Sequence, residues 1–119
     1  MPEWKNSSLK DKTSYSLHGL RDAFISEKAI RNEAKGALIV LILAVGHGLP
    51  LPRIAAVFLL SLIPIIVELI NTALETVVDL MLGATYREDV RMAKDMLSAA
   101  VFISLFVSYS LCLLIIFFF

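Results

Sequence analysis

Apolar residues gather in three long runs after a polar first third of the chain. The runs cover residues 36–51, 54–67 and 96–119. About 20 apolar residues cross the hydrocarbon core of a bilayer, so the third run is long enough by itself. The first run extends back to residue 29 with snorkelling cations, and the helical pattern of the second continues to residue 82. The pattern predicts an all-α membrane protein with three transmembrane helices, over about residues 29–49, 52–82 and 94–119.

A shorter amphipathic segment precedes these spans, over about residues 9–26. Within it, Leu17, Leu20 and Phe24 recur at helical spacing among polar and charged positions. The spacing predicts a helix lying on the cytoplasmic membrane surface, which Trp4 and Tyr15 would suit. The alternative is a frayed, partly disordered tail.

Two turns connect the predicted spans. Pro50 and Pro52 mark the first turn, and residues 83–90 form the second loop. Pro64 lies inside the second span and predicts a modest kink, which neighbours can tolerate by satisfying the freed carbonyl. These short connections leave no room for a separate soluble domain.

Composition supports a membrane protein and excludes several other classes. The chain has 119 residues, of which 58% are hydrophobic and 18% charged, with a mean hydropathy of +0.79. This length allows one domain at most. Eleven basic residues balance eleven acidic ones, which argues against nucleic-acid binding. Cys112 is the only cysteine, so a disulfide scaffold is excluded. The polar N-terminal region shows no secretory signal, so the apolar runs are expected to be permanent spans.

The placement of Lys and Arg predicts the orientation in the membrane. Seven of these residues precede the first apolar run, Arg53 lies in the first turn, and Arg87, Arg91 and Lys94 lie in the second loop. The positive-inside rule therefore places the N-terminus and the second loop in the cytoplasm and the C-terminus outside.

A polar stripe on the second span is the strongest functional signal. At about 100° per residue, its four members share one face about 80° wide, and they are Glu68, Asn71, Glu75 and Asp79. Charged groups on an apolar helix are costly unless they face protein, water or a cation. With Arg53 at the outer boundary, Glu68 falls near the inner edge of the hydrocarbon core, the depth of a lipid hydroxyl. The alternative is a polar seam that fixes an oligomer.

Further polar groups are expected at the same level. Lys94, Asp95 and Ser98 begin the third span, where Ser98, Ala99 and Ala100 are small enough for close helix packing. An antiparallel hairpin places them beside Glu75 and Asp79, and Glu27 and Glu33 precede the first span. Carboxylates without His or Cys clusters suit Mg²⁺, as phosphoryl transfer requires. The chain has no GxxxxGK[ST] and no GxGxxG motif.

The chain resembles the small bacterial integral-membrane diacylglycerol kinases. The resemblance lies in Glu68-x-x-Asn71-x-x-x-Glu75-x-x-x-Asp79, followed by Ala93-Lys94-Asp95-x-x-x-Ala99-Ala100-Val101. It extends from about Tyr15 to the C-terminus. It implies a homotrimer in the bacterial cytoplasmic membrane, with composite sites between subunits. It also implies that, with Mg²⁺, these sites transfer a phosphoryl group from ATP to a lipid alcohol.

The resemblance also implies a role for each matching residue. Glu68 matches the catalytic base, with Asn71 and Asp79 organising the site. Glu27 and Glu75 match the metal ligands. The nucleotide contacts implied are Tyr15, Glu27, Glu75, Tyr86, Arg87, Lys94 and Asp95. The lipid side is implied for Arg31, Glu33, Glu68 and Ser98.

Local sequence favours diacylglycerol as the lipid within this family. Ser98-Ala-Ala-Val and Glu33-Ala-Lys-Gly resemble the diacylglycerol branch, whereas the alternative is the undecaprenol kinase branch. Two departures stand out: the family's upstream ATP-contacting arginine falls near Ser8, and the stretch before Lys94 is one residue longer. A transporter or a non-catalytic assembly subunit is the remaining alternative. The uncharged outer half of the second span, which offers only Ser61, counts against transport.

Overall fold

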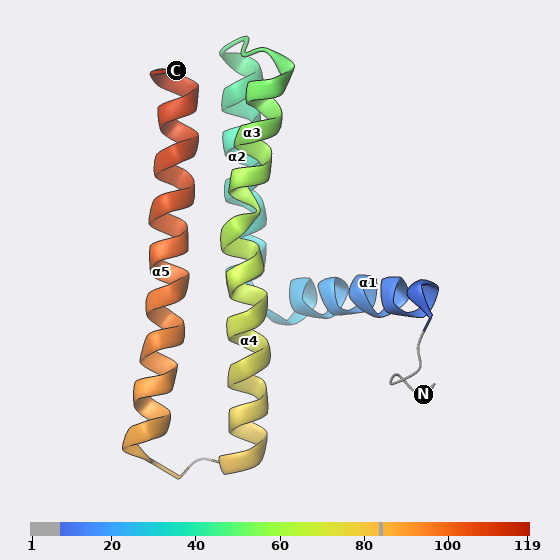
Figure 1. The fold of residues 1–119 in the computed structure, drawn as a ribbon, viewed down its shortest axis with the longest axis vertical. Coiled ribbons are helices and arrows are strands. Elements are labelled where there is room, and N and C mark those ends of the chain that lie inside the picture. Colours follow the sequence, from blue (N-terminus) through green and yellow to red (C-terminus); the bar gives the residue numbers. More distant parts are fainter. Residues whose placement is uncertain (1–7, 84) are drawn as a thin grey trace.

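The computed structural model describes residues 8–83 and 85–119, and every regular element in them is a helix. In chain order these helices are α1 Leu9–Ser26, α2 Lys28–Gly46, α3 Leu51–Ser61, α4 Ile63–Leu82 and α5 Glu88–Phe117. Helices α2 to α5 stand side by side, and α1 projects from them at a steep angle (Figure 1). The all-α prediction is confirmed. Trp4 lies outside the described residues.

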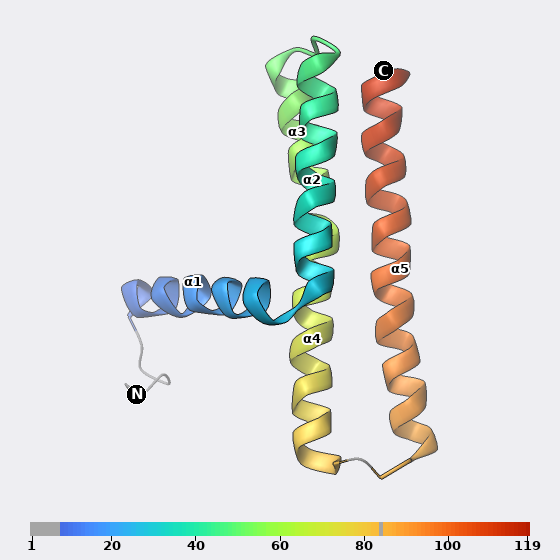
Figure 2. The ribbon, with the colours of Figure 1, turned by 180° about the vertical axis from the view of Figure 1, so that it is seen from behind.

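Helix α1 has the predicted bounds and begins with a capping box. The Ser8 side chain accepts from the Asp11 N–H, and the Asp11 carboxylate accepts from the Ser8 N–H. This reciprocal pair satisfies two donors that a helix start leaves open. No residue of α1 is buried, as a helix at a membrane surface requires. Seen from behind, α1 joins the base of α2, while α4 and α5 continue past that level (Figure 2).

The end of the bundle opposite α1 holds the hydrophobic core. Buried side chains from α2, α3 and α5 meet there, and we call this the packed end: Val40, Ala44, Val57, Cys112 and Ile116. The turn from α2 to α3 confirms the predicted proline turn. Gly48 adopts a φ of 70° in it, and Pro52 falls in the first turn of α3, where a missing N–H costs nothing.

The second predicted span is one rod with a break at Leu62. Helix α3 ends at Ser61, α4 begins at Ile63, and Pro64 occupies the first turn of α4. The kink predicted at Pro64 is therefore present as a short interruption. Ser108 of α5 donates a hydrogen bond to Leu60 O at 2.6 Å, which satisfies the carbonyl that Pro64 leaves without a donor.

Helix α5 begins at Glu88, six residues before the prediction, so the second loop is shorter than expected. Glu88 and Asp89 lie in its first turn, where acidic side chains favour the positive end of a helix. Within the chain, other small residues of α5 make the helix contacts. Ser104, Ser108 and Cys112 are buried at four-residue spacing, whereas Ser98, Ala99 and Ala100 are exposed.

Two helices of the described chain are long and apolar enough to cross a membrane. They are the α3–α4 rod, Leu51–Leu82, and α5, Glu88–Phe117, and only 22% of each apolar window is buried. Side chains this apolar and this exposed suit contact with lipid. Helix α2 is not among these candidate spans, because Arg31, Glu33 and Lys35 near its start make it too highly charged. Its role as a span stays a prediction.

Candidate active site

Four carboxylates from α2, α4 and the α1–α2 junction form one cluster. We call Glu27, Glu33, Glu68 and Glu75 the carboxylate cluster. Glu68 interacts electrostatically with Glu33, Glu75 and Glu27, and it accepts a hydrogen bond from Asn71 Nδ2 at 3.5 Å. Glu33 and Glu68 are only 6% and 7% exposed. Glu68 thus faces Glu33 of α2, while Asp79, at the far end of the polar stripe, pairs with Lys94 of α5.

Two buried oxygen atoms in this region lack a hydrogen-bond partner among the described residues. They are Glu33 Oε2 and Asn71 Oδ1. Buried polar atoms are normally satisfied, so each such atom calls for an explanation. Each of these two oxygens can still accept a hydrogen bond from a group bound between α2 and α4.

A charged cleft opens farther along α4, where it faces the start of α5. Its volume is about 710 Å³, and its walls are Asp79, Gly83, Thr85, Tyr86, Arg87, Val90, Arg91, Lys94 and Asp95. Lys94 Nζ donates to Asp79 Oδ1 at 2.7 Å, which ties α5 to α4. Lys94 also interacts electrostatically with Glu75. The juxtaposition of Lys94 with Glu75 and Asp79 was predicted.

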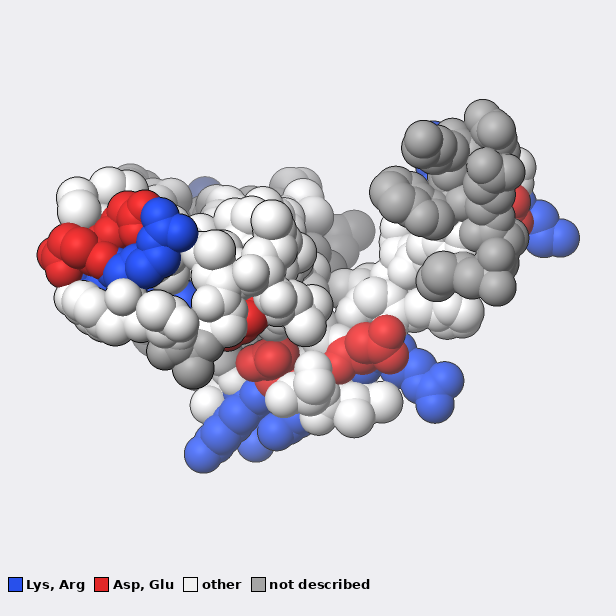
Figure 3. Space-filling model, turned by 90° about the horizontal axis from the view of Figure 1, so that it is seen from below, with Lys and Arg blue, Asp and Glu red and all other residues white. Residues whose placement is uncertain are grey.

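The other charged side chains of the charged cleft form ion pairs at the start of α5. Arg91 pairs with Glu88 and with Asp95, the latter at 2.5 Å. Arg87 pairs with Asp89 at 2.9 Å. Seen from below, acidic and basic side chains mingle over this end of the molecule (Figure 3). Each cation of the charged cleft is therefore paired with a carboxylate of this chain.

Tyr86 lies in the loop before α5, and its surroundings change the pKa of its hydroxyl. Its hydroxyl donates to Glu88 Oε2 at 2.6 Å. Because this bond favours the protonated phenol, it raises the pKa of Tyr86 above its ordinary value. Tyr86 therefore stays neutral at physiological pH and serves as a hydrogen-bond donor in the cleft.

Arg31 lies at the α1–α2 junction and binds the backbone. Its Nη1 donates to Phe24 O at 2.9 Å and to Ile25 O at 2.8 Å, two carbonyls that the end of α1 leaves open. Glu27 is the single residue between the two helices. Arg31 was predicted on the lipid side, and within this chain its contacts instead fix the position of α1 next to Glu27.

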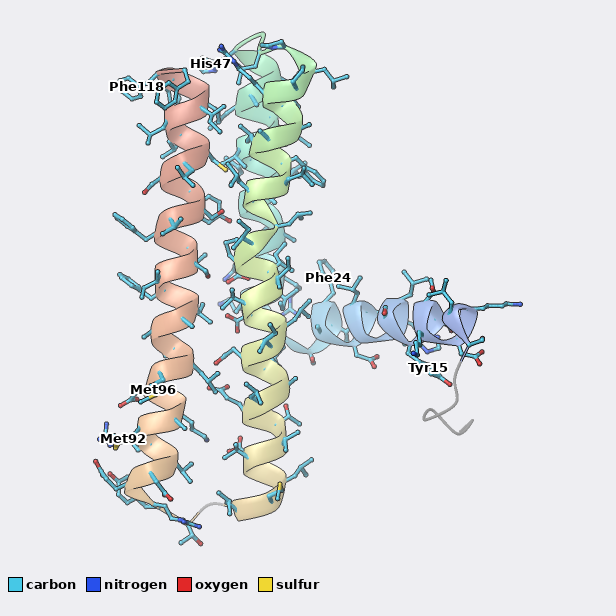
Figure 4. All side chains as sticks on the ribbon, in the orientation of Figure 1. Tyr15, Phe24, His47, Met92, Met96 and Phe118 are labelled. Carbon is cyan, nitrogen blue, oxygen red and sulfur yellow. The ribbon has the colours of Figure 1, made fainter. Side chains whose placement is uncertain are left out.

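The structure brings some predicted site residues together and separates others. Tyr15 lies far out on α1, on the side away from the start of α5 marked by Met92 and Met96 (Figure 4). Ser98 is exposed on α5. Ser8, at the position of the family's upstream arginine, caps α1. One chain thus contains a carboxylate cluster and a charged cleft, with Tyr15 and Ser98 outside both.

The donor atoms fit a magnesium ion bound together with phosphates. Among the described residues, no three His, Cys, Asp or Glu side chains are placed so that they could hold a metal ion by themselves. Mg²⁺ usually needs only one or two carboxylates when it binds a nucleotide. Glu27 and Glu75 are hard oxygen donors, and Glu68 interacts electrostatically with both.

Several residues around the site were not singled out from the sequence. Arg91 and Thr85 line the charged cleft, and the spacing of three and four residues from Arg91 to Lys94 and Asp95 would have identified Arg91. A second cleft of about 590 Å³ separates α1 from α4. It is lined by Ser16, Gly19, Leu20, Asp22, Ala23, Ser26, Leu69, Thr72 and Ala73. No local sequence signal marks it, because its walls come from two distant helices.

The fold and the site together define a class of helical membrane proteins with buried carboxylates beside a charged cleft. The model of the prokaryotic diacylglycerol kinase family matches residues 14–117 of the chain. The diacylglycerol kinase of Escherichia coli K12 is 42% identical over 96 residues, covering 79% of this chain and 76% of that protein. The Haemophilus influenzae diacylglycerol kinase is 40% identical over 97 residues, covering 82% and 81%. The chain belongs to the prokaryotic diacylglycerol kinase family.

Proposed function

We propose that the protein transfers the γ-phosphoryl group of ATP to diacylglycerol at the cytoplasmic face of the membrane, forming phosphatidic acid. The observation that carries this proposal is the continuity of α4, which runs from the buried Glu68 to the charged cleft at Asp79. A lipid hydroxyl at the first end and a nucleotide at the second would lie along one polar stripe. The kinase activity of the named relatives supports the same reaction.

Glu68 is proposed as the base of the reaction. Its buried carboxylate would accept the proton of the lipid hydroxyl as the oxygen forms its bond to the γ-phosphorus and the bond to ADP breaks. Asn71 donates to Glu68 and orients it. Glu33, which faces Glu68 from α2, would contact the lipid glycerol through its free oxygen.

The nucleotide side is proposed to use the charged cleft. Lys94 would neutralise charge on the γ-phosphoryl group, and Asp79 holds Lys94 in place. Tyr86, Arg87 and Asp95 line the same cleft and would contact the nucleotide. Glu27 and Glu75 would hold Mg²⁺, which would offset the negative charge of the phosphates when bound.

The protein is proposed to form a homotrimer with active sites shared between subunits. Tyr15 lies far from the start of α5, where the charged cleft of its own chain opens, and the polar stripe on α4 is incompletely covered. A neighbouring subunit would supply the missing contacts, including those of Tyr15 and Ser98. We also propose three spans, formed by α2, the α3–α4 rod and α5, with the N-terminus and the α4–α5 loop in the cytoplasm of a bacterial inner membrane.

The decisive experiment compares two lipid acceptors in mixed micelles. Purified protein receives ATP and Mg²⁺ with either diacylglycerol or undecaprenol, and Glu75→Gln is the control. We expect phosphorylation of diacylglycerol, lost in Glu75→Gln while the oligomer is retained. Preference for undecaprenol would move the chain to the other branch of the family. Failure with both lipids in a folded oligomer would refute the kinase assignment and favour an assembly role.

A further inference from the structure

The break between α3 and α4 leaves two backbone carbonyls without their usual helical donors. Pro64 has no N–H for Leu60 O, four residues earlier. The Leu62 N–H turns to Leu59 O at 3.2 Å and also faces Leu60 O, so Phe58 O loses its usual donor and Leu60 O keeps only this N–H of the helix cap. Unpaired carbonyls inside a bilayer are costly because no water reaches them, so both need another partner.

Two serine hydroxyls supply these partners, and they do so from different helices. Ser61 Oγ donates to Phe58 O at 2.6 Å within α3. Ser108 Oγ donates to Leu60 O at 2.6 Å from α5, across the helix interface. Both serines are completely buried. The bond from Ser108 therefore ties α5 to the rod at its one interruption.

A second hydrogen bond ties α5 to the α3–α4 rod, near the start of α5. Lys94 Nζ donates to Asp79 Oδ1 at 2.7 Å. From residue 60 to residue 79 a helix rises about 28 Å, and the polar stripe lies between these two points. Glu68 follows Pro64 by about one turn, so the geometry of the break decides which way the carboxylate points.

We propose that Ser108 is a positioning residue for phosphoryl transfer, which holds the rod at Pro64 and thereby sets the rotation of α4 and the direction of Glu68. This inference rests on the proposed kinase function. Ser108 acts through backbone and touches neither substrate. The loss of its hydroxyl frees Leu60 O and allows α4 to turn or slide against α5.

The chain offers a matched control in Ser104, one turn earlier on α5. Ser104 is also buried, at 8% exposure, and its hydroxyl donates to Val101 O of its own helix at 2.7 Å. Ser104→Ala removes the same atom from the same helix without cutting a tie between helices. The proposal predicts different outcomes for the two serines.

The test measures turnover and amide hydrogen exchange on the full-length protein in micelles. Misplacing a reacting group by about 1 Å can slow a reaction up to about 10²-fold, and we expect Ser108→Ala to lower kcat about tenfold with KM for ATP within about twofold. Amides of residues 63–71 should exchange faster. Ser104→Ala should leave kcat and this exchange close to those of the parent.

A second background tests the cause. Pro64→Ala restores an N–H that can donate to Leu60 O, so adding Ser108→Ala to it should change kcat less than about twofold. If Ser108→Ala alone does not fold, recovery of folded protein in the double variant supports the tie, and no recovery refutes it.

Other results overturn the proposal. Equal effects of Ser108→Ala and Ser104→Ala on kcat and exchange would do so, as would an undiminished loss in the Pro64→Ala background. If the parent protein phosphorylates no lipid, the proposed function fails by itself. The exchange measurement then decides separately whether Ser108 holds α4, and unchanged exchange would refute that as well.

Discussion

The two ends of the bundle are built in opposite ways. At the packed end, Ala44, Val57 and Cys112 are completely buried among three helices. At the other end, α4 and α5 extend past α1 as a pair, and Leu80 and Met81 are 81% and 76% exposed. One chain is therefore sufficient to build the core, whereas the half that carries the site leaves apolar surface for lipid or another subunit to cover.

This contrast separates the effects that substitutions should have. Changes at the packed end should alter the free energy of unfolding and affect turnover only through the fraction of folded protein. Changes at the site end remove few packed contacts and should alter turnover directly. Four substitutions test the distinction, beginning with the largest expected effect.

Lys94→Met should lower turnover about 10²-fold or more, because it removes a cation aimed at the transferred group. The unfolding midpoint should hardly change, since the pair with Asp79 is exposed and contributes little to stability. Phosphatidic acid formation and thermal unfolding in micelles measure the two quantities. Lys35→Met makes the same change at an exposed position on α2 and should keep full turnover; an equal loss there would refute a local role for Lys94.

Gly36→Ala, where α2 packs against Tyr109 of α5, should chiefly lower the stability of the fold. A Cβ at residue 36 would lie 2.2 Å from the Tyr109 hydroxyl and 3.0 Å from its ring carbon Cζ, so the ring must move. Its contact with Glu33 O, 3.4 Å long, would be lost. We expect a destabilisation of about 1–3 kcal/mol, measured by unfolding in micelles.

Tyr109→Phe tests the origin of that loss. It removes the hydroxyl that the new methyl group would meet, so it should recover part of the stability in the Gly36→Ala background. The Gly46→Ala control adds a methyl group where nothing lies within 4 Å. A loss in Gly36→Ala that Tyr109→Phe leaves unchanged would contradict this packing account.

Arg31→Gln should have an intermediate effect at the boundary between the two regions. It removes two hydrogen bonds from a charged donor to the last carbonyls of α1, and it should loosen that helix by about 1–2 kcal/mol. Faster amide exchange over residues 20–26, with unchanged exchange in α5, is the expected result. Arg21→Gln, on the exposed face of α1, is the control; equal exchange in both variants would argue against the contact.

Arg91→Gln should have the smallest effect on folding. Its pairs with Glu88 and Asp95 are about half exposed to solvent, where salt and side-chain entropy offset the attraction. We expect an unchanged unfolding midpoint in low and high salt. A clear, salt-dependent loss of stability would show that this network supports α5 and that the site end is more tightly built than its exposure indicates.

Local sequence patterns predicted most of the fold. The bounds of α1 follow from its amphipathic spacing, and the rod over residues 51–82 follows from its apolar run. The start of α5 was wrong by six residues because Glu88 and Asp89 resemble a loop, although acidic residues favour a helix start. The interruption at Leu62 could be expected from Pro64, but its exact position depends on Ser108, 48 residues away.

The polar stripe of the candidate site was predictable because helical periodicity fixes it. Contacts between helices were harder to predict from the sequence. The tie from Lys94 to Asp79 follows from the hairpin, whereas the capping role of Arg31 and the cleft between α1 and α4 require the angle of α1. The packing of small residues was placed on Ser98, Ala99 and Ala100, while four-residue spacing from Ser104 would have identified the buried face.

The unequal lengths of the helices have a consequence for the host membrane. Helix α2, with 19 residues, rises about 28 Å, close to the thickness of a hydrocarbon core. The rod, with 32 residues, rises about 48 Å and must project beyond it. A bilayer of longer acyl chains would cover more of the projecting segment and draw Glu68 away from the headgroups, at a modest cost per ångström of mismatch. Acyl-chain length should therefore tune how readily the enzyme meets its lipid.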